Sequence, residues 1–173
     1  MGARLKDNIL VDVQLRQLIE QGYVSSALRS AREPHGAPVP DAQGGIPAII
    51  MEMLFYSRPG VIEVLPALPP SLVKGSISGL LARTCARIDK LALDMDARTV
   101  DLTVTSARKQ RVALIARHGM ERISASGGTL AAKPKSGAAD CDLRLPAGQP
   151  VEVKLKLARR EPLHWADRVT RSA

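Results

Sequence analysis

The spacing of apolar residues changes about one third of the way along the chain, from a helical period to a period of two. Within residues 5 to 22, Leu5, Ile9 and Val13 share one helical stripe, which predicts an amphipathic helix that packs against a core. The apolar residues beside this stripe are Val11, Leu15, Leu18 and Ile19. A second apolar face predicts a helix from about Ile46 to Ser57. The proline- and glycine-rich segment between the two helices predicts a long loop.

The second part of the chain consists of short alternating segments with turn signals between them. Leu91–Met95 and Val100–Thr105 flank an Asp96-Ala97-Arg98 turn and predict a β-hairpin. Because such strands follow one another without helices between them, the pattern favours an antiparallel β-sandwich after the helix pair, and therefore an α+β fold. Polar, glycine-containing stretches such as 133–139 predict loops. The other predicted strands are Val61–Leu65, Ser76–Leu81, Arg111–Ala116, Glu121–Ser124 and Val151–Leu157.

These patterns divide the chain into three parts. Residues 1–58 hold the helix pair and the loop that joins it, residues 59–160 form the β-domain, and residues 161–173 form a loose tail. With 173 residues, of which 45% are hydrophobic, the chain is long enough to bury the core of a helical piece plus a small β-domain.

The formal net charge of +8 comes entirely from the second half of the chain. Residues 1–80 carry 7 basic against 7 acidic side chains, and residues 81–173 carry 18 against 10. Many of the basic residues are mixed with aspartates and have no aromatic residues among them, which favours solvated strand faces and turns over a nucleic-acid stripe. They are Arg83, Arg87, Lys90, Arg98, Arg108, Lys109, Arg111 and Arg117, mixed with Asp89, Asp94, Asp96 and Asp101. No nucleic-acid partner is therefore expected, and an RNA-binding domain remains an alternative that rests on charge alone.

Cysteine usage and hydropathy give no sign of a metal or a membrane. Cys85 and Cys141 lie far apart, without a CxxC motif or a histidine at ligand spacing, so we expect two free, partly buried thiols and neither a metal nor another cofactor. The first ten residues carry charges and no apolar segment of the kind found in secretory signals, and the compartment stays unassigned. No run is long enough to span a bilayer, so no membrane partner is expected.

Asp41 is the acidic residue in the setting most suited to catalysis. The pattern places it in a glycine-containing loop just before the second helix, where backbone amides and the helix N-terminus orient a negative charge. Hydrolysis with inversion needs one carboxylate to deprotonate water and a carboxylic acid roughly 6.5 to 9.5 Å away to protonate the leaving oxygen. The chain offers a candidate for the first role only. The alternative is that Asp41 merely ends the loop and caps the helix.

The remaining acidic and histidine candidates have simpler explanations. Glu52 lies off the apolar stripe of its helix and is expected to face solvent or form an ion pair. Glu63 alternates with apolar neighbours and is expected on the outer face of a strand. His35, in the loop near Asp41, is either a substrate contact or simply exposed.

A series of short motifs runs without gaps from Asp41 to about Ser106. It consists of the Asp41–Gly45 loop, the Met51-Glu52-Met53-Leu54 helix, the Leu65–Pro69 run and the Gly75–Leu80 strand. In this order the motifs resemble glycoside hydrolase family 95, the α-L-fucosidase-like enzymes. The resemblance implies that residues 1–58 are the end of a catalytic α/α toroid and that a C-terminal β-domain follows.

The resemblance also implies roles for individual residues. Asp41 falls on the general base of the family's inverting mechanism, and Gln43 stands in place of the asparagine of that loop, with His35 as a second substrate contact. The acidic glutamate and the assisting asparagines belong to upstream segments of the family. The implied function is therefore the C-terminal segment of a hydrolase that cleaves fucosylated or related glycans, incomplete alone and completed by an upstream catalytic segment.

A second class of function stays open beside the hydrolase. The chain also fits a noncatalytic β-sandwich that binds carbohydrate or another partner, with a helical arm at its N-terminus. Only four residues are aromatic, which is few for the sugar-stacking surfaces of a complete glycosidase. An exposed platform built on Tyr56 or Trp165 would favour the binding module.

Overall fold

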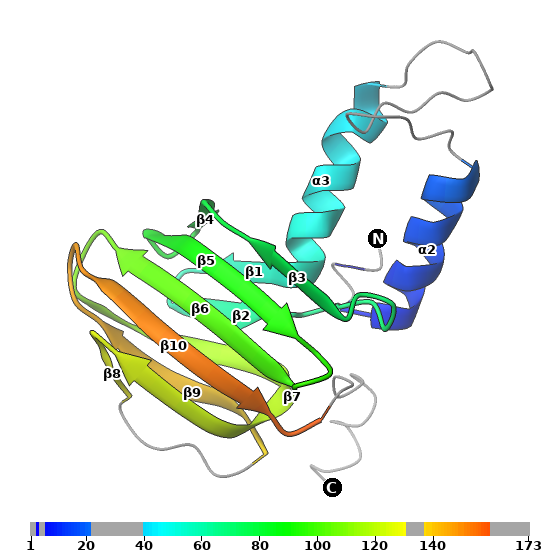
Figure 1. Cartoon of the computed structure of the whole chain (residues 1–173). Helices are drawn as coiled ribbons and strands as arrows, with labels where there is room; N and C mark the ends of the chain where they lie inside the picture. Colours follow the sequence, from blue (N-terminus) through cyan, green and yellow to red (C-terminus); the bar gives the residue numbers. More distant parts are fainter. Residues whose placement is uncertain (1–2, 4–5, 22–39, 131–136, 160–173) are drawn as a thin grey trace, which may run out of the picture.

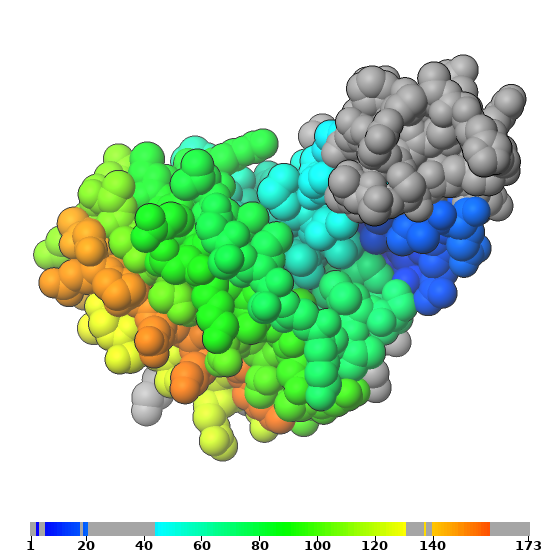
Figure 2. Space-filling view, turned by 45° about the horizontal axis from the view of Figure 1, so that its top comes forward, coloured from blue at the N-terminus to red at the C-terminus, as the bar shows by residue number. Residues whose placement is uncertain are grey.

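The described part of the chain consists of two helices followed by a large sheet (Figure 1). The structure is a computed structural model that describes residue 3 and residues 6–21, 40–130 and 137–159. The helices are α2 (Asn8–Gln21) and α3 (Pro40–Leu54). In Figure 2 they stand beside the rounded sheet domain, at one side of it. The predicted α+β class is confirmed.

Helix α2 confirms the first predicted helix, and of its two predicted apolar stripes the one with Val11 faces the core. It begins after Asp7, whose side chain caps it by accepting a hydrogen bond from the Leu10 amide at 2.9 Å. Val11 is only 1% exposed, whereas Ile9 and Val13 of the other stripe are 56% and 45% exposed. An apolar stripe of this helix therefore faces outward within the described structure.

Helix α3 begins and ends earlier than the predicted helix from Ile46 to Ser57, which was wrong at both ends. It starts at Pro40, whose missing amide costs nothing in the first turn. It ends at Leu54, because Phe55–Arg58 forms strand β1, which pairs antiparallel with β2 (Val61–Val64). The predicted loop around Asp41 is therefore the first turn of a helix.

Ten strands form one hydrogen-bonded sheet, and the predicted hairpin across residues 96–98 is confirmed within it. After β1 and β2 come β3 (Lys74–Ile77), β4 (Leu80–Ala82), β5 (Ala86–Asp94), β6 (Thr99–Ser106), β7 (Gln110–Ser126), β8 (Thr129–Leu130), β9 (Ala138–Leu145) and β10 (Pro150–Leu157). The order is β1-β2-β7-β10-β6-β5-β3, with β4 paired to β5, and β9 paired to β7 and β8.

Strand β7 curls this sheet around the core. Its first half pairs in parallel with β2 and antiparallel with β9, and its last residues pair with β10. The register with β9 shifts between Ile115 and Met120, where the strand bends. Figure 1 shows β9 on the side of the domain away from β5. The predicted antiparallel sandwich is not confirmed, since the sheet is continuous and one pairing is parallel.

Two local predictions in this region were wrong. The strands expected at Arg111–Ala116 and Glu121–Ser124 are one strand of 17 residues, β7. The loop expected over 133–139 ends earlier than predicted, because Ala138 already belongs to β9. Residues 133–136 of that loop lie outside the described residues.

The core lies on the inner face of the curled sheet. In β6 and β10 every second residue is buried, as the alternation of apolar and polar residues predicts. Full burial of each such side chain contributes about 1.5–3 kcal/mol relative to exposure. The buried residues of these two strands are Val100, Leu102, Val104, Ser106, Val151, Val153, Leu155 and Leu157.

Candidate functional site

The predicted site residues lie at the start of α3 or before it. Asp41 and Gln43 are in the first turn of α3, and their side chains lie outside the described part of the structure. His35 is also outside the described residues. A negative charge in a first helical turn is stabilised by the helix dipole, which applies to Asp41. The roles of Asp41, Gln43 and His35 therefore stay predictions.

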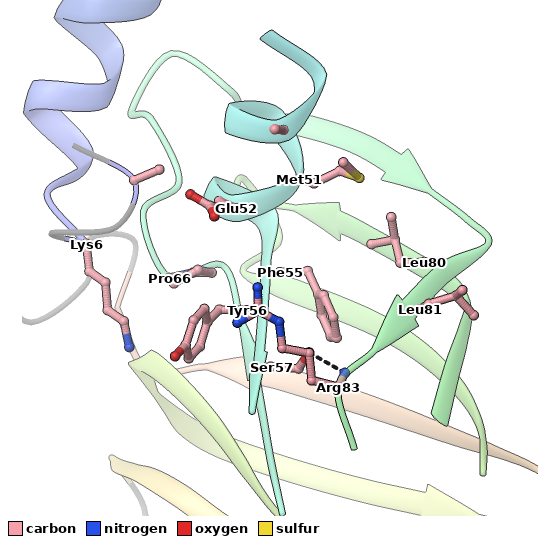
Figure 3. A pocket seen from close by; sticks show the side chains of 12 residues that line it. Lys6, Met51, Glu52, Phe55, Tyr56, Ser57, Pro66, Leu80, Leu81 and Arg83 are labelled. Atoms are coloured by element: carbon pink, nitrogen blue, oxygen red, sulfur yellow. Dashed lines mark hydrogen bonds between the residues drawn. The ribbon is translucent and has the colours of Figure 1, made fainter. Parts of the chain in front are cut away.

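A pocket of about 540 Å³ opens at the other end of α3 (Figure 3). It lies where the end of α3 meets β1 and β4, and the segment before α2 closes one side. Its volume falls in the range of roughly 300–1,000 Å³ that small-molecule sites occupy. The lining residues used below are Lys6, Ala48, Met51, Glu52, Phe55, Tyr56, Leu81 and Arg83.

One side of this pocket is polar and carries three charged groups. Lys6 Nζ lies 4.8 Å from the centre of the Tyr56 ring, a cation–π contact, and also pairs with Glu63. Figure 3 shows the Arg83 side chain running from β4 into the pocket, on the side of Tyr56 and Glu52. Within the described residues, the Arg83 guanidinium forms no hydrogen bond or ion pair.

The opposite side of the pocket is apolar and open to solvent. Met51 and Leu81 are 41% and 82% exposed. Phe55 lies between them and the polar side, as Figure 3 shows, and is buried. A pocket with one ionic and one apolar side suits a ligand that carries a charged group on a partly apolar ring.

The backbone of α3 connects this pocket with Asp41. Positions 41 and 52 are eleven residues apart, which is about three helical turns plus 20°, so they share a face of the helix at roughly 16 Å along its axis. Ala48 lies on the same face and lines the pocket. Near the middle of this face, a Cβ added to Gly45 would meet nothing within 4 Å. The face between the two positions is therefore open at Gly45.

Glu63 is buried, and its predicted place on an outer strand face was wrong. It is 2% exposed on β2, and its carboxylate accepts a hydrogen bond from Arg117 Nε at 2.8 Å and pairs with Lys6. Both of its carboxylate oxygens are engaged by these two cations, so neither is available to a ligand. The pair with Lys6 ties the segment before α2 to the sheet.

His118 is buried without a hydrogen-bond partner among the described residues. It is 1% exposed, and both ring nitrogens are unsatisfied, as is one terminal nitrogen of its neighbour Arg117. Burial lowers the pKa of His118 to about 4 from its ordinary value of 6.5, so the ring is neutral at pH 7. No pocket described above includes it, and its effect is on stability.

Neither cysteine lies in an arrangement suited to catalysis. Both are free, as predicted, but Cys85 is exposed and not partly buried. Burial, together with the Asp140 and Asp142 carboxylates, raises the pKa of the Cys141 thiol to about 11, which makes it a poor nucleophile at neutral pH. Within the described residues, no group of three or more histidine, cysteine or acidic side chains is placed to hold a metal ion.

A second hollow, of about 580 Å³, lies between the two helices and β3. Its walls are mostly apolar, with Ile19 and Ile50 from the helices and Ile77 from the sheet, and Asp12 and Arg16 form an ion pair at its edge. The hollow lacks the mixture of charge and aromatic rings found in the first pocket.

Neither described helix is long and apolar enough to cross a membrane.

The residues that build the pocket at the end of α3 were not predicted as site residues from the sequence. Arg83 was assigned to a solvated strand face, and Tyr56 was considered only as a surface platform. One signal was available, because two of only four aromatic residues, Phe55 and Tyr56, are adjacent in an otherwise aromatic-poor chain. The convergence of Lys6 with this pair was not visible, since it depends on the fold of the N-terminal segment.

Comparison with known families gives one match. The family described as glycoside hydrolase family 95, C-terminal domain, matches residues 56–150. The match begins at Tyr56 in β1 and ends at Pro150, the first residue of β10, so it covers most of the sheet. No individual curated protein matches the chain. Because the match covers more than half of the 173 residues, the chain belongs to glycoside hydrolase family 95 and carries the C-terminal domain of that family.

Proposed function

We propose that this chain is the C-terminal part of an α-L-fucosidase-like enzyme that hydrolyses terminal fucosyl or related glycosidic bonds with inversion. Carbohydrates are the substrate class of a glycoside hydrolase. The observation that carries the proposal is the direct continuation of α3, which holds Asp41 in its first turn, into the strands that match the family. This is the order in which the resembling enzymes join their catalytic barrel to the C-terminal domain.

In this proposal Asp41 is the general base that activates the attacking water. The general acid must lie roughly 6.5 to 9.5 Å from it. Glu52 is about three turns away, roughly 16 Å along the axis of α3. Glu63 is held between Arg117 and Lys6. Neither residue suits the acid's role, which supports an acid supplied by an upstream catalytic segment.

The test is the hydrolysis of an aryl α-L-fucoside by the purified chain, alone and together with the upstream barrel segment of a family 95 enzyme. We expect no turnover above background from the chain alone, because one carboxylate cannot perform both proton transfers. The reconstituted enzyme should be active, and Asp41→Asn should lower its kcat by about 10²- to 10⁴-fold.

Glu20→Gln is the matched control, since it removes an exposed carboxylate from the other described helix, outside both pockets. It should change kcat much less than Asp41→Asn does. Turnover by the chain alone that is lost in Asp41→Asn would contradict the incomplete site. If Asp41→Asn leaves the kcat of the reconstituted enzyme unchanged, the noncatalytic carbohydrate-binding module is favoured instead.

A further inference from the structure

The pocket at the end of α3 contains a cation that the described structure leaves unpaired. Of its two basic side chains, Lys6 pairs with Glu63 and covers one face of the Tyr56 ring. The backbone amide of Arg83 donates to Ser57 Oγ at 2.9 Å, which fixes the base of that side chain. Its guanidinium points into the pocket and has no described partner (Figure 3). A planar guanidinium in this state is suited to bind an oxyanion through two parallel hydrogen bonds.

The rest of the pocket suits a sugar ring that carries such an oxyanion. Met51 and Leu81 form an exposed apolar side, and Tyr56 and Phe55 supply aromatic surface. Sugar rings have apolar faces that pack on such groups and hydroxyls that bind polar ones. The volume of about 540 Å³ leaves room for a saccharide unit beside the Arg83 side chain.

We propose that this pocket is a saccharide subsite for an anionic sugar residue, one that carries a carboxylate or a sulfate. The inference rests on the proposed function, since it takes the ligand to be part of the enzyme's carbohydrate substrate. The subsite is separate from Asp41, at roughly 16 Å along one face of α3. An oligosaccharide spans that distance and a single sugar does not, so the proposed substrate is an acidic oligosaccharide.

The test measures binding by the full chain, without any hydrolysis, using isothermal titration calorimetry. The probes are an oligogalacturonate trimer, its full methyl ester and a sulfated galacto-oligosaccharide of the same length. We expect the acidic trimer or the sulfated probe to bind at least about tenfold more tightly than the methyl ester, because only an anion engages the guanidinium. The tighter of these two probes identifies which anion the subsite takes.

Arg83→Ala should weaken binding of the anionic probe by about tenfold or more. Arg122→Ala is the matched control, because Arg122 is also exposed, carries the same charge and lies on β7 outside the lining of the pocket. It should change the affinity by less than about twofold, the size expected for general electrostatics at a screened surface. Both variants should keep the thermal midpoint of the parent chain.

Equal binding of the acidic trimer, the sulfated probe and the methyl ester would overturn the proposal, and so would equal losses in the two arginine variants. Asp41→Asn should leave affinity for galacturonate monomer unchanged, and a loss there would contradict a separate subsite. Failure of this binding proposal can be told apart from failure of the proposed hydrolysis. Binding that depends on Arg83, with no Asp41-dependent turnover in the reconstituted enzyme, would support the pocket's ligand and refute the proposed catalysis.

Discussion

At the scale of single residues, His118 couples the stability of the fold to pH. Its pKa in the folded chain is about 4, against an ordinary value of 6.5, so between these values the unfolded chain binds a proton that the folded chain does not. Stability should therefore fall as pH is lowered from about 6.5 to about 4, by about 1.4 kcal/mol per pH unit and about 3 kcal/mol in all. Chemical denaturation at several pH values measures this slope.

A His118→Leu variant provides the comparison, because an apolar side chain of similar size needs no proton and no hydrogen bond in a buried position. Its stability should stay nearly constant across the same window. Four aspartates also have a pKa below the ordinary value of 3.8, and their loss of stability near pH 4 is common to both proteins, so it cancels in the comparison. They are Asp12, Asp89, Asp94 and Asp142. Parallel pH profiles for the parent chain and His118→Leu would show that the buried ring is not responsible.

The sequence predicts the side of a strand on which a residue lies, but not whether that side is covered. The alternation around Glu63 correctly indicated a strand, and the expected exposure failed because Lys6 reaches that residue from the segment before α2. The same limit explains why Arg83 was not identified as a pocket residue. Asp41 was named from its motif alone, since the resemblance depends on local order and not on tertiary contacts, and its role stays a prediction.

At the scale of elements, two tight turns with glycine allow the cost of backbone strain to be measured apart from the cost of a steric clash. Gly127, after β7, has φ +79°, and a Cβ added there would lie 2.5 Å from the Pro150 carbonyl oxygen. Gly148, before β10, has φ +68°, but an added Cβ would meet nothing within 4 Å. Gly148→Ala should cost about 1 kcal/mol of stability for the left-handed conformation alone.

Gly127→Ala should cost more than Gly148→Ala by a further 1–3 kcal/mol or so, because β7 and β10 must separate to admit the methyl group. Urea denaturation of both variants gives the comparison, and the difference between them cancels the shared effect on the unfolded chain. Equal destabilisation would mean that the carbonyl of Pro150 moves away at no cost.

Elements with a strong local signal were predicted well, and their ends were not. The β5–β6 hairpin was found because a polar turn separates two cleanly alternating runs. The end of α3 was missed because the pairing of β1 with β2 overrides the helical pattern of Phe55 and Tyr56. The continuity of β7 was missed because Gly119, at φ +68°, resembles a turn in the sequence and is a bend within one strand in the structure.

At the scale of the whole molecule, the helices and the sheet differ in how firmly they are held. Helix α2 buries Val11 and leaves Ile9, Val13 and Ile19 exposed, whereas the central strands are buried on alternate residues along their whole length. We predict that the α2 amides exchange with solvent at least about tenfold faster than those of β6, because local opening of α2 exposes little apolar surface. Hydrogen exchange followed by mass spectrometry measures both.

The β6 amides serve as the internal reference in that experiment. Equal protection of α2 and β6 would mean that helices and sheet open as one unit, and the chain would then fit a self-sufficient module better than part of a larger enzyme. The division of the chain at residues 58 and 160 stays a prediction until such data exist. The α+β class was predictable because the helical and strand periods occupy separate stretches of the chain, whereas the curl depends on long-range pairings that leave no local pattern.

The parallel pairing of β2 with β7 has a consequence for how the chain reaches this structure. Val61 meets Ala113, so β2 leaves the ribosome well before its partner exists. At typical rates of synthesis this interval is roughly 3 to 10 s. During this interval the nascent chain exposes an apolar strand whose backbone is paired with β1 at most. Glu63 also lacks its partner Arg117 until that residue has been synthesised. Closure of the sheet is therefore a late event in biogenesis, because it requires residues from the second half of the chain.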